Sequence, residues 1–195
     1  MRDRDVREAL HRWLTRQHEH EADTTRVVDE LGIAGTVRVD TAVFNGAFSG
    51  YEIKSASDTL RRLPKQVEMY SAVLDYAYLV VASNHVAHAR TLLPSWWGII
   101  EAVPVGGSVD LRHRRKARWN SRVDAFTLCT LLWRDEALEE LEARGWAAGV
   151  RSKPKVVLWE RLATRLELPE LRELVRERLK VRESWRADAP SLQSA

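Results

Sequence analysis

The sequence is poor in cysteine, and Cys129 is the single one among its 195 residues. One cysteine cannot form an internal disulfide, which excludes a disulfide scaffold and fits a reducing cytoplasm. The chain also lacks any apolar run near the ~20 residues that a membrane-spanning helix needs. Its first ten residues, MRDRDVREAL, carry charges where a signal peptide would be apolar. We therefore expect a cytoplasmic globular protein with no membrane partner.

Net charge is low, at +3, but it is unevenly distributed. The stretch RHRRKARW, residues 112–119, contains five basic residues: Arg112, Arg114, Arg115, Lys116 and Arg118. This stretch has two interpretations. It is a solvated surface loop, or it contacts nucleic-acid phosphates with Trp119 available to stack on a base.

Hydrophobic periodicity predicts alternating helices and strands in the first 110 residues. Val6, Leu10, Trp13 and Leu14 recur at helical spacing. Turn residues and apolar runs mark the boundaries of the later elements. The predicted elements are helices at 3–20 and 24–31, strands at 36–44 and 47–54 around an Asn45-Gly46 turn, a helix through 65–76, a strand at 76–83, a short helix at 84–93 and a strand at 97–105.

The pattern becomes helical from about residue 121 onward. We therefore predict an α/β core over residues 1–110 with a mixed sheet, followed by an all-helical C-terminal region over 111–187. The small polar residues at 188–195 predict a disordered tail.

The segment GYEIK ends in an acid, one spacer and a lysine, Glu52 and Lys54, which share one face of a strand. Alone, this pair is compatible with an exposed ion pair. Asp40 lies in the preceding strand, and the loop length decides its relation to the pair. A two-residue turn at Asn45-Gly46 places Asp40 opposite Tyr51, on the other face from Glu52. A three-residue loop or a bulge brings the two carboxylates together.

Two adjacent carboxylates can bind a hard divalent cation such as Mg²⁺ through oxygen. Such an ion lowers the pKa of a bound water and stabilises charge on a phosphoryl oxygen. A lysine beside it can orient the water or stabilise the pentavalent state. This chemistry gives Asp40, Glu52 and Lys54 a shared purpose that a surface ion pair lacks.

The run VD, eleven residues, then EIK resembles the PD-(D/E)xK nuclease superfamily, with Val39 in place of the proline. In this resemblance Asp40 is the first acid, and Glu52 and Lys54 form the E-x-K element. QVEMY resembles the Q-x-x-x-Y motif of the RecB-like branch, carried by Gln66 and Tyr70. The first-helix acid of many members corresponds to Glu30 or its neighbour Asp29. Most of the chain also resembles a family of small bacterial proteins within this superfamily.

The resemblance implies a restriction-endonuclease-like α-β-β-β-α-β core and a Mg²⁺- or Mn²⁺-dependent deoxyribonuclease that hydrolyses phosphodiester bonds, in DNA repair or defence. The implied site has metal ligands Asp40, Glu52 and Glu30 and further catalytic residues Lys54, Gln66 and Tyr70. DNA is the expected partner, with RNA, a homodimer or a partner protein left open. Phosphate contacts are expected from Arg61, Arg62 and the 112–118 cations. The alternative is a nucleic-acid-binding or assembly module that keeps the fold and needs a partner for activity.

Overall fold

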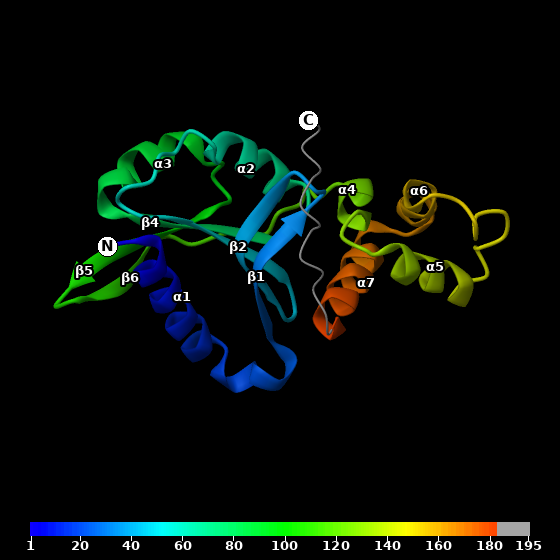
Figure 1. Ribbon diagram of the computed structural model, residues 1–195, viewed down its shortest axis with the longest axis horizontal. Coiled ribbons are helices and arrows are strands. Elements are labelled where there is room, and N and C mark those ends of the chain that lie inside the picture. The colour runs from blue at the N-terminus through cyan, green and yellow to red at the C-terminus, as the bar shows by residue number, and fades with distance from the viewer. Residues whose placement is uncertain (183–195) are drawn as a thin grey trace, which may run out of the picture. The chain divides into compact units, whose positions relative to one another are not determined.

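A computed structural model describes residues 1–182 of the chain (Figure 1). The expected tail at 188–195 and the end of the helical region at 187 lie outside the described residues. The described residues form two compact units, one made of residues 1–31 and 39–123, the other of residues 32–38 and 124–182. The expected boundary at residue 110 falls inside a strand of the first unit.

The sheet has six strands in the order of the chain, and it is mixed. β3 and β4 are parallel, as are β4 and β5, whereas β2–β3 and β5–β6 are antiparallel. The α/β class expected from the sequence is therefore confirmed. The strands are β1 (Arg26–Ile33), β2 (Val37–Phe44), β3 (Phe48–Lys54), β4 (Tyr76–Ala82), β5 (Gly98–Val105) and β6 (Ser108–Arg115).

Helices cover both faces of this sheet (Figure 1). They are α1 (Asp3–Gln17), α2 (Leu63–Ser71) and α3 (Val86–Leu92), with short 3₁₀ turns η1 (Glu19–Thr24) and η2 (Ser83–His85). The apolar side of α1 packs on Tyr51 and Ile53 of β3 and on the central strands. Because side chains alternate along a strand, Glu52 and Lys54 point to the opposite face, where α2 lies. The fold thereby delivers both residues to α2.

The loop between β2 and β3 contains three residues, Asn45 to Ala47, because Phe44 pairs with Phe48. Asn45 closes it, with its backbone N–H donating to Ala47 O and its side-chain oxygen accepting from Ala47 N–H. The pairing continues to Thr41 opposite Tyr51. A loop with an odd number of residues brings Asp40 opposite Glu52 on the same face of the sheet. The two-residue turn is therefore ruled out.

The helix predicted at 24–31 is wrong, because this segment forms β1. Val28, Leu31 and Ile33 are its buried residues. The spacing between the first two resembles a helix because Glu30 has a left-handed backbone, with φ of 55°, which shifts the alternation of faces by one residue. The strand propensity of the Val27-Val28 pair is the signal that argues against a helix here.

The helical character expected from residue 111 is also wrong at its start, because β6 runs from Ser108 to Arg115. Gly106 and Gly107 both have positive φ, 51° and 82°, and join β5 to β6 as a two-residue hairpin. The predicted elements include no hairpin there. β6 is an edge strand, and its charged residues, typical of edges, hide it from a hydrophobicity pattern.

The second unit is helical over the region from residue 124 to 182, as expected. Its helices are α4 (Ala125–Cys129), α5 (Arg134–Ala143), α6 (Lys155–Arg165) and α7 (Leu168–Val181). Their buried residues include Leu141, Leu158, Leu162 and Leu171. Within residues 1–182 we find no helix that combines the length and apolar character needed to cross a membrane.

Gly50 is packed so tightly that we predict Gly50→Ala to be destabilising. An added Cβ would lie 2.4 Å from Cδ1 of Leu74, whose side chain is fully buried and cannot move aside without disturbing the core. We expect a loss of about 1–3 kcal/mol in urea unfolding. Gly46→Ala is the matched control, because a Cβ there meets no atom within 4 Å. Equal effects of the two variants would contradict the packing described for β3 and the α2 region.

Candidate active site

The carboxylate of Glu52 is the centre of a buried polar cluster. The side chain is almost fully buried, and Lys54 Nζ donates to its Oε1. Two further donors come from α2: Gln66 Nε2 to Oε1 at 2.5 Å, and the Tyr70 hydroxyl to Oε2 at 2.6 Å. Gln66 and Tyr70 are four residues apart on one helix, so both reach the same acid. The structure thus brings together four of the residues selected from the sequence.

Asp40 lies where the β2–β3 pairing ends. Its Oδ2 accepts the backbone N–H of Ile53 at 2.6 Å, in the way that a strand carbonyl otherwise would. Ile53 is the residue between Glu52 and Lys54, so this bond holds the Asp40 carboxylate against the E-x-K element. The side chain remains about one-fifth exposed. Asp40 is therefore the acid of the cluster that solvent can reach.

Burial has the largest effect on the electrostatics of the site. Burial, and then the neighbouring Glu52 charge, raise the pKa of Asp40 to about 7, against the opposing effects of the Ile53 hydrogen bond and of Lys54 and Arg7. A raised pKa in one acid is what two neighbouring carboxylates without a bound cation are expected to show. Burial and the Glu52 charge also raise the pKa of Tyr70, so its hydroxyl stays protonated and acts as a donor.

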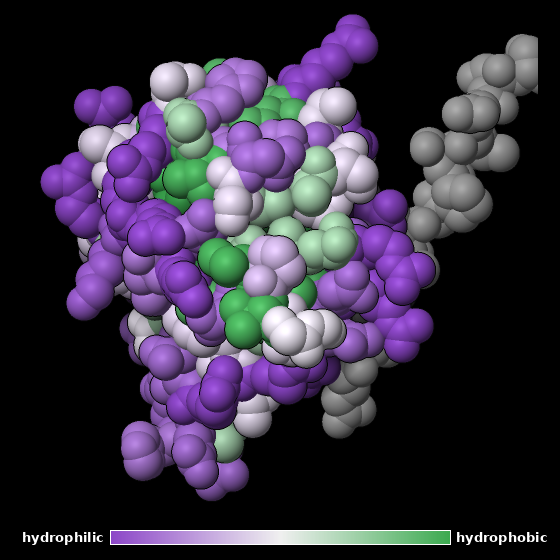
Figure 2. Space-filling model, turned by 90° about the vertical axis from the view of Figure 1, so that its left-hand side faces the viewer, coloured by the Kyte–Doolittle hydropathy of each residue, from purple (hydrophilic) through white to green (hydrophobic). Residues whose placement is uncertain are grey.

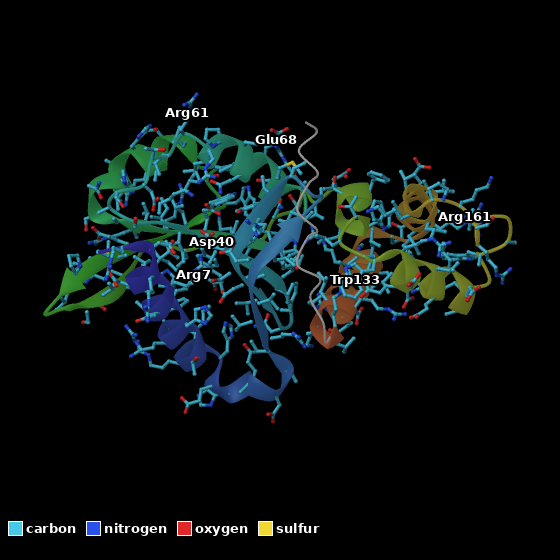
Figure 3. All side chains as sticks on the ribbon, in the orientation of Figure 1. Arg7, Asp40, Arg61, Glu68, Trp133 and Arg161 are labelled. Carbon is cyan, nitrogen blue, oxygen red and sulfur yellow. The ribbon has the colours of Figure 1, made fainter. Side chains whose placement is uncertain are left out.

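Arg7 on α1 contacts the site and was not selected from the sequence (Figure 3). Its Nη1 donates to the backbone carbonyl of Asp40 at 2.7 Å, and its Nη2 lies 3.7 Å from the Asp40 carboxylate. Nη2 also bonds Glu30 at 2.9 Å. An isolated arginine in a helix has no sequence signature, so only the folded structure identifies this contact.

Glu30 lies on β1, not on the first helix as expected. Its carboxylate bonds Arg7, and Asp29 accepts hydrogen bonds from Thr41 and His11 at 2.8 and 3.0 Å. Among the described residues we find no cluster of three or more acidic, histidine or cysteine side chains arranged to hold a metal. The structure therefore pairs Asp40 with Glu52 and leaves Glu30 as a partner of Arg7.

The carboxylate oxygens of Asp40 and Glu52 are suitable ligands for a hard cation. Mg²⁺ is commonly held by one or two carboxylates, with water and phosphate oxygens completing its shell, and Asp40 and Glu52 offer such a pair. Gln66 Oε1 is buried and accepts no hydrogen bond from the described residues. A buried acceptor without a donor at a charged site suits a bound water. The residues present are thus compatible with Mg²⁺ or Mn²⁺.

The cations expected to contact phosphate fall into two groups. Arg61 and Arg62 are exposed just before α2, the helix that carries Gln66 and Tyr70 (Figure 3). The others lie on or just after β6. There Arg112 pairs with Asp110 and Arg114 with Glu101.

The remaining cations of the second group differ in what they contact. Arg115 is half-buried and donates to the carbonyls of Trp97 and Pro94 at 2.6 and 3.0 Å, which is a structural role. Arg118 bonds Ser95 Oγ, and Lys116 is exposed. Lys116 and Arg118 are accordingly the members of this group best placed to meet a ligand.

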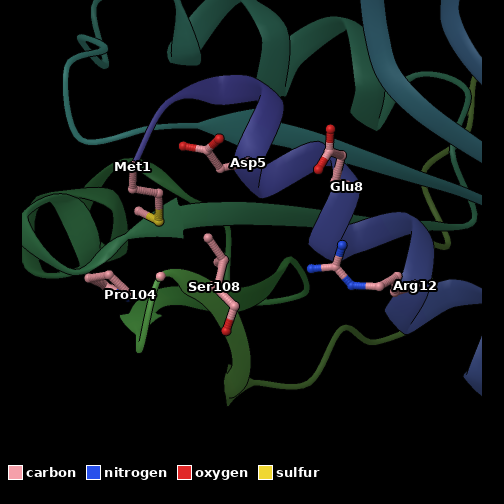
Figure 4. A pocket seen from close by; sticks show the side chains of 8 residues that line it. Met1, Asp5, Glu8, Arg12, Pro104 and Ser108 are labelled. Carbon is pink, nitrogen blue, oxygen red and sulfur yellow. The ribbon is translucent and has the colours of Figure 1, made fainter.

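A pocket of about 590 Å³ lies away from these residues, between α1 and the β5–β6 hairpin (Figure 4). Its two acidic lining residues already have partners, since Asp5 accepts the Arg2 N–H and Glu8 pairs with Arg4. The face on the α1 and β5–β6 side shows an apolar area ringed by hydrophilic residues (Figure 2). The pocket includes no residue of the Glu52 cluster.

We predict that Asp40→Asn stabilises the protein at pH 8. The folded-state pKa of Asp40, about 7, lies above its ordinary value of 3.8. The folded protein therefore binds the extra proton between these values, and stability falls as pH rises from about 4 to 7. Removing the charge should add on the order of 2 kcal/mol at pH 8, with the gain shrinking toward pH 4. Urea unfolding across this range measures it, and a gain that stays constant with pH would contradict the raised pKa.

Comparison with known proteins gives a family and a set of more distant structures. Protein cII of Enterobacteria phage P4 is 27% identical over 176 residues, which is 90% of this chain and 65% of that protein, so the match spans less than two thirds of the relative. Two solved structures are similar at low level. A protein of unknown function from Silicibacter pomeroyi has a TM-score of 0.44 and 20% identity, over 75% of this chain and 96% of that one.

The other structure is SfsA of Pyrococcus furiosus in complex with Ca²⁺, with a TM-score of 0.37 and 13% identity, over 59% of this chain and 64% of that one. The family model of bacteriophage P4 protein cII matches residues 1–189, nearly the whole sequence. The chain belongs to the bacteriophage P4 protein cII family.

Proposed function

We propose that the chain is a metal-dependent deoxyribonuclease of the PD-(D/E)xK type. The convergence of Asp40 and Lys54 on Glu52, with Gln66 and Tyr70 donating to the same carboxylate, carries the proposal. The order of elements α1, β1, β2, β3, α2, β4 agrees with the α-β-β-β-α-β core of that superfamily. An ion pair with only a structural role would not need a second, partly exposed acid beside it.

Each residue of the cluster has a role that follows from its contacts. Asp40 and Glu52 would hold Mg²⁺ or Mn²⁺ by their carboxylate oxygens. Gln66 and Tyr70 fix the Glu52 carboxylate through one hydrogen bond to each oxygen. Lys54, the cation of the cluster, would orient the attacking water or stabilise the negative charge that develops on the phosphoryl oxygens.

The proposed reaction is hydrolysis of a phosphodiester bond. Water oxygen forms a bond to phosphorus, the bond to the leaving oxygen breaks, and the leaving oxygen takes up a proton. When bound, the metal supplies a more acidic water and charge stabilisation at the phosphate. Arg61 and Arg62, exposed before α2, would contact the flanking phosphates of the DNA.

A second function is favoured by one observation. Lys54 is 5% exposed and is held by Glu52, so the two must separate before either contacts a phosphate or a metal. In a binding or assembly module that keeps this fold, the Lys54–Glu52 pair could stay intact until a partner protein binds. DNA binding that EDTA leaves unchanged, together with no cleavage by the chain alone, would select this function.

Lys54→Ala should abolish cleavage. Labelled single- and double-stranded DNA and RNA, incubated with Mg²⁺ or Mn²⁺, measure the activity, and we expect a loss of about 100-fold or more. Lys180→Ala is the matched control, since Lys180 lies on α7 and pairs with Glu177. Circular dichroism checks folding. If the single variant unfolds, Glu52→Gln/Lys54→Met removes both charges of the buried pair and should fold without activity. If the wild-type chain cleaves none of these substrates, the proposed nuclease activity is refuted.

Binding of Mg²⁺ should raise the melting temperature of the wild type. At a concentration ten times its Kd, the ion adds about 1.4 kcal/mol, which corresponds to about 3–6 °C for a chain of this size. Asp40→Asn removes one ligand and should lose the response. Asp110→Asn is the control, because Asp110 lies on the edge strand β6 and pairs with Arg112. Equal shifts in all three proteins would place the ion elsewhere.

A further inference from the structure

The helical unit has an uneven distribution of charge. Residues 134–143, which form α5, carry five acidic side chains and one arginine, whereas residues 144–165 carry six basic side chains and one glutamate. The acids of α5 are largely neutralised by α7 and the residue after it. Arg178 bonds Glu139 and Glu140 at 2.8 and 2.6 Å, and Arg182 bonds Glu136 at 2.9 Å. The excess positive charge is therefore left on the α5–α6 loop and α6.

The cations before and at the start of α6 lie in an exposed run of the chain. Residues 151–156 are all exposed. Arg151 pairs with Glu142 at the surface, and its carbonyl accepts a bond from Arg134. Lys153 and Lys155 have no carboxylate within salt-bridge distance in residues 1–182. Exposed lysines without acidic partners are free to neutralise an external anion.

Aromatic side chains continue this surface along α6. Lys155 Nζ lies 5.0 Å from the ring centre of Trp159, whose indole N–H donates to Leu132 O. Trp159 packs edge-on against Phe126, with centres 6.5 Å apart, and Phe126 is 37% exposed. We call this surface the basic–aromatic patch; its members are Phe126, Arg134, Arg151, Lys153, Lys155 and Trp159.

The loop that presents the patch is held by internal hydrogen bonds. Arg161, labelled in Figure 3, donates to the carbonyls of Trp146 and Ala148 at 2.9 and 2.7 Å. Lys153 N–H bonds Val150 O at 2.9 Å. Gly149 supplies the left-handed backbone that the turn needs, with φ of 76°. A loop ordered before binding loses less entropy when it contacts a ligand.

We propose that the basic–aromatic patch is a DNA-binding surface of the helical unit, separate from the Glu52 cluster. Lysine and arginine heads would meet the phosphates, and the exposed edge of the Phe126–Trp159 pair would meet a base or sugar. Nucleic acid fits better than an acidic protein segment because an aromatic ring next to unpaired cations matches the alternation of phosphate and base along a strand. The proposal stands whether or not the Glu52 cluster cleaves.

The test compares two double variants of the full chain. Lys153→Gln/Lys155→Gln removes the two cations without acidic partners, and Arg4→Gln/Arg16→Gln removes two exposed cations from α1. Binding to a labelled duplex of about 30 base pairs is followed by fluorescence anisotropy in EDTA, between about 50 and 200 mM salt. Because each phosphate contact contributes about 0.9 to the slope of log affinity against log salt, the patch variant should lose about 1.8 of slope. The α1 variant should keep the wild-type slope and affinity.

Several results would overturn the patch. They are wild-type affinity and slope in the patch variant, an equal loss in the α1 variant, or no duplex binding by the wild type at the lowest salt. Binding to vesicles that contain phosphatidylserine tests a lipid surface as the ligand. If the patch variant loses vesicle binding and the wild type binds no duplex, the basic–aromatic patch binds lipid and not DNA. If the wild type binds the duplex through the patch but cleaves no substrate, the proposed nuclease activity is wrong and the proposed DNA-binding surface is supported.

Discussion

Burying the Glu52 carboxylate costs several kcal/mol unless donors replace its water. The donors come from two elements: Lys54 from the same strand, and Gln66 and Tyr70 from α2. α2 can supply both because its parallel crossover from β3 to β4 lays it on the face to which Glu52 points. The polar cluster and the α2 side of the sheet therefore support each other, and loss of one donor would leave a buried charge poorly compensated.

Asp40 shows the opposite balance. Its carboxylate has one hydrogen bond, from Ile53, while burial and then the nearby Glu52 charge disfavour its ionisation. Arg7 offsets this only in part, since it bonds the Asp40 backbone at 2.7 Å but stands 3.7 Å from the carboxylate. Stored electrostatic strain of this kind is common where a site is arranged for a ligand that carries the missing charge. A divalent cation beside Asp40 would relieve it.

The core of the site could be predicted from the sequence because its geometry depends on short-range rules. Glu52 and Lys54 share a face by strand alternation, Gln66 and Tyr70 by helical spacing, and Asp40 joins them once the loop has an odd length. The three-residue loop itself could not be chosen from Asn45-Gly46 alone. Arg7 and the true place of Glu30 could not be predicted, because they depend on how α1 and β1 pack. The left-handed Glu30 also concealed β1 behind a helical spacing.

The basic side chains of the protein differ in whether an acidic partner neutralises them. On β6, Arg112 and Arg114 have acidic partners, and Arg115 is committed to two carbonyls. The RHRRKARW stretch is the strongest basic signal in the sequence, yet much of its charge is engaged within the fold. At 151–156, fewer cations stand in the sequence, but two lysines lack acidic partners within residues 1–182. The cations available to bind a phosphate backbone are those without acidic partners, and the number of basic residues in a stretch of sequence does not give their number.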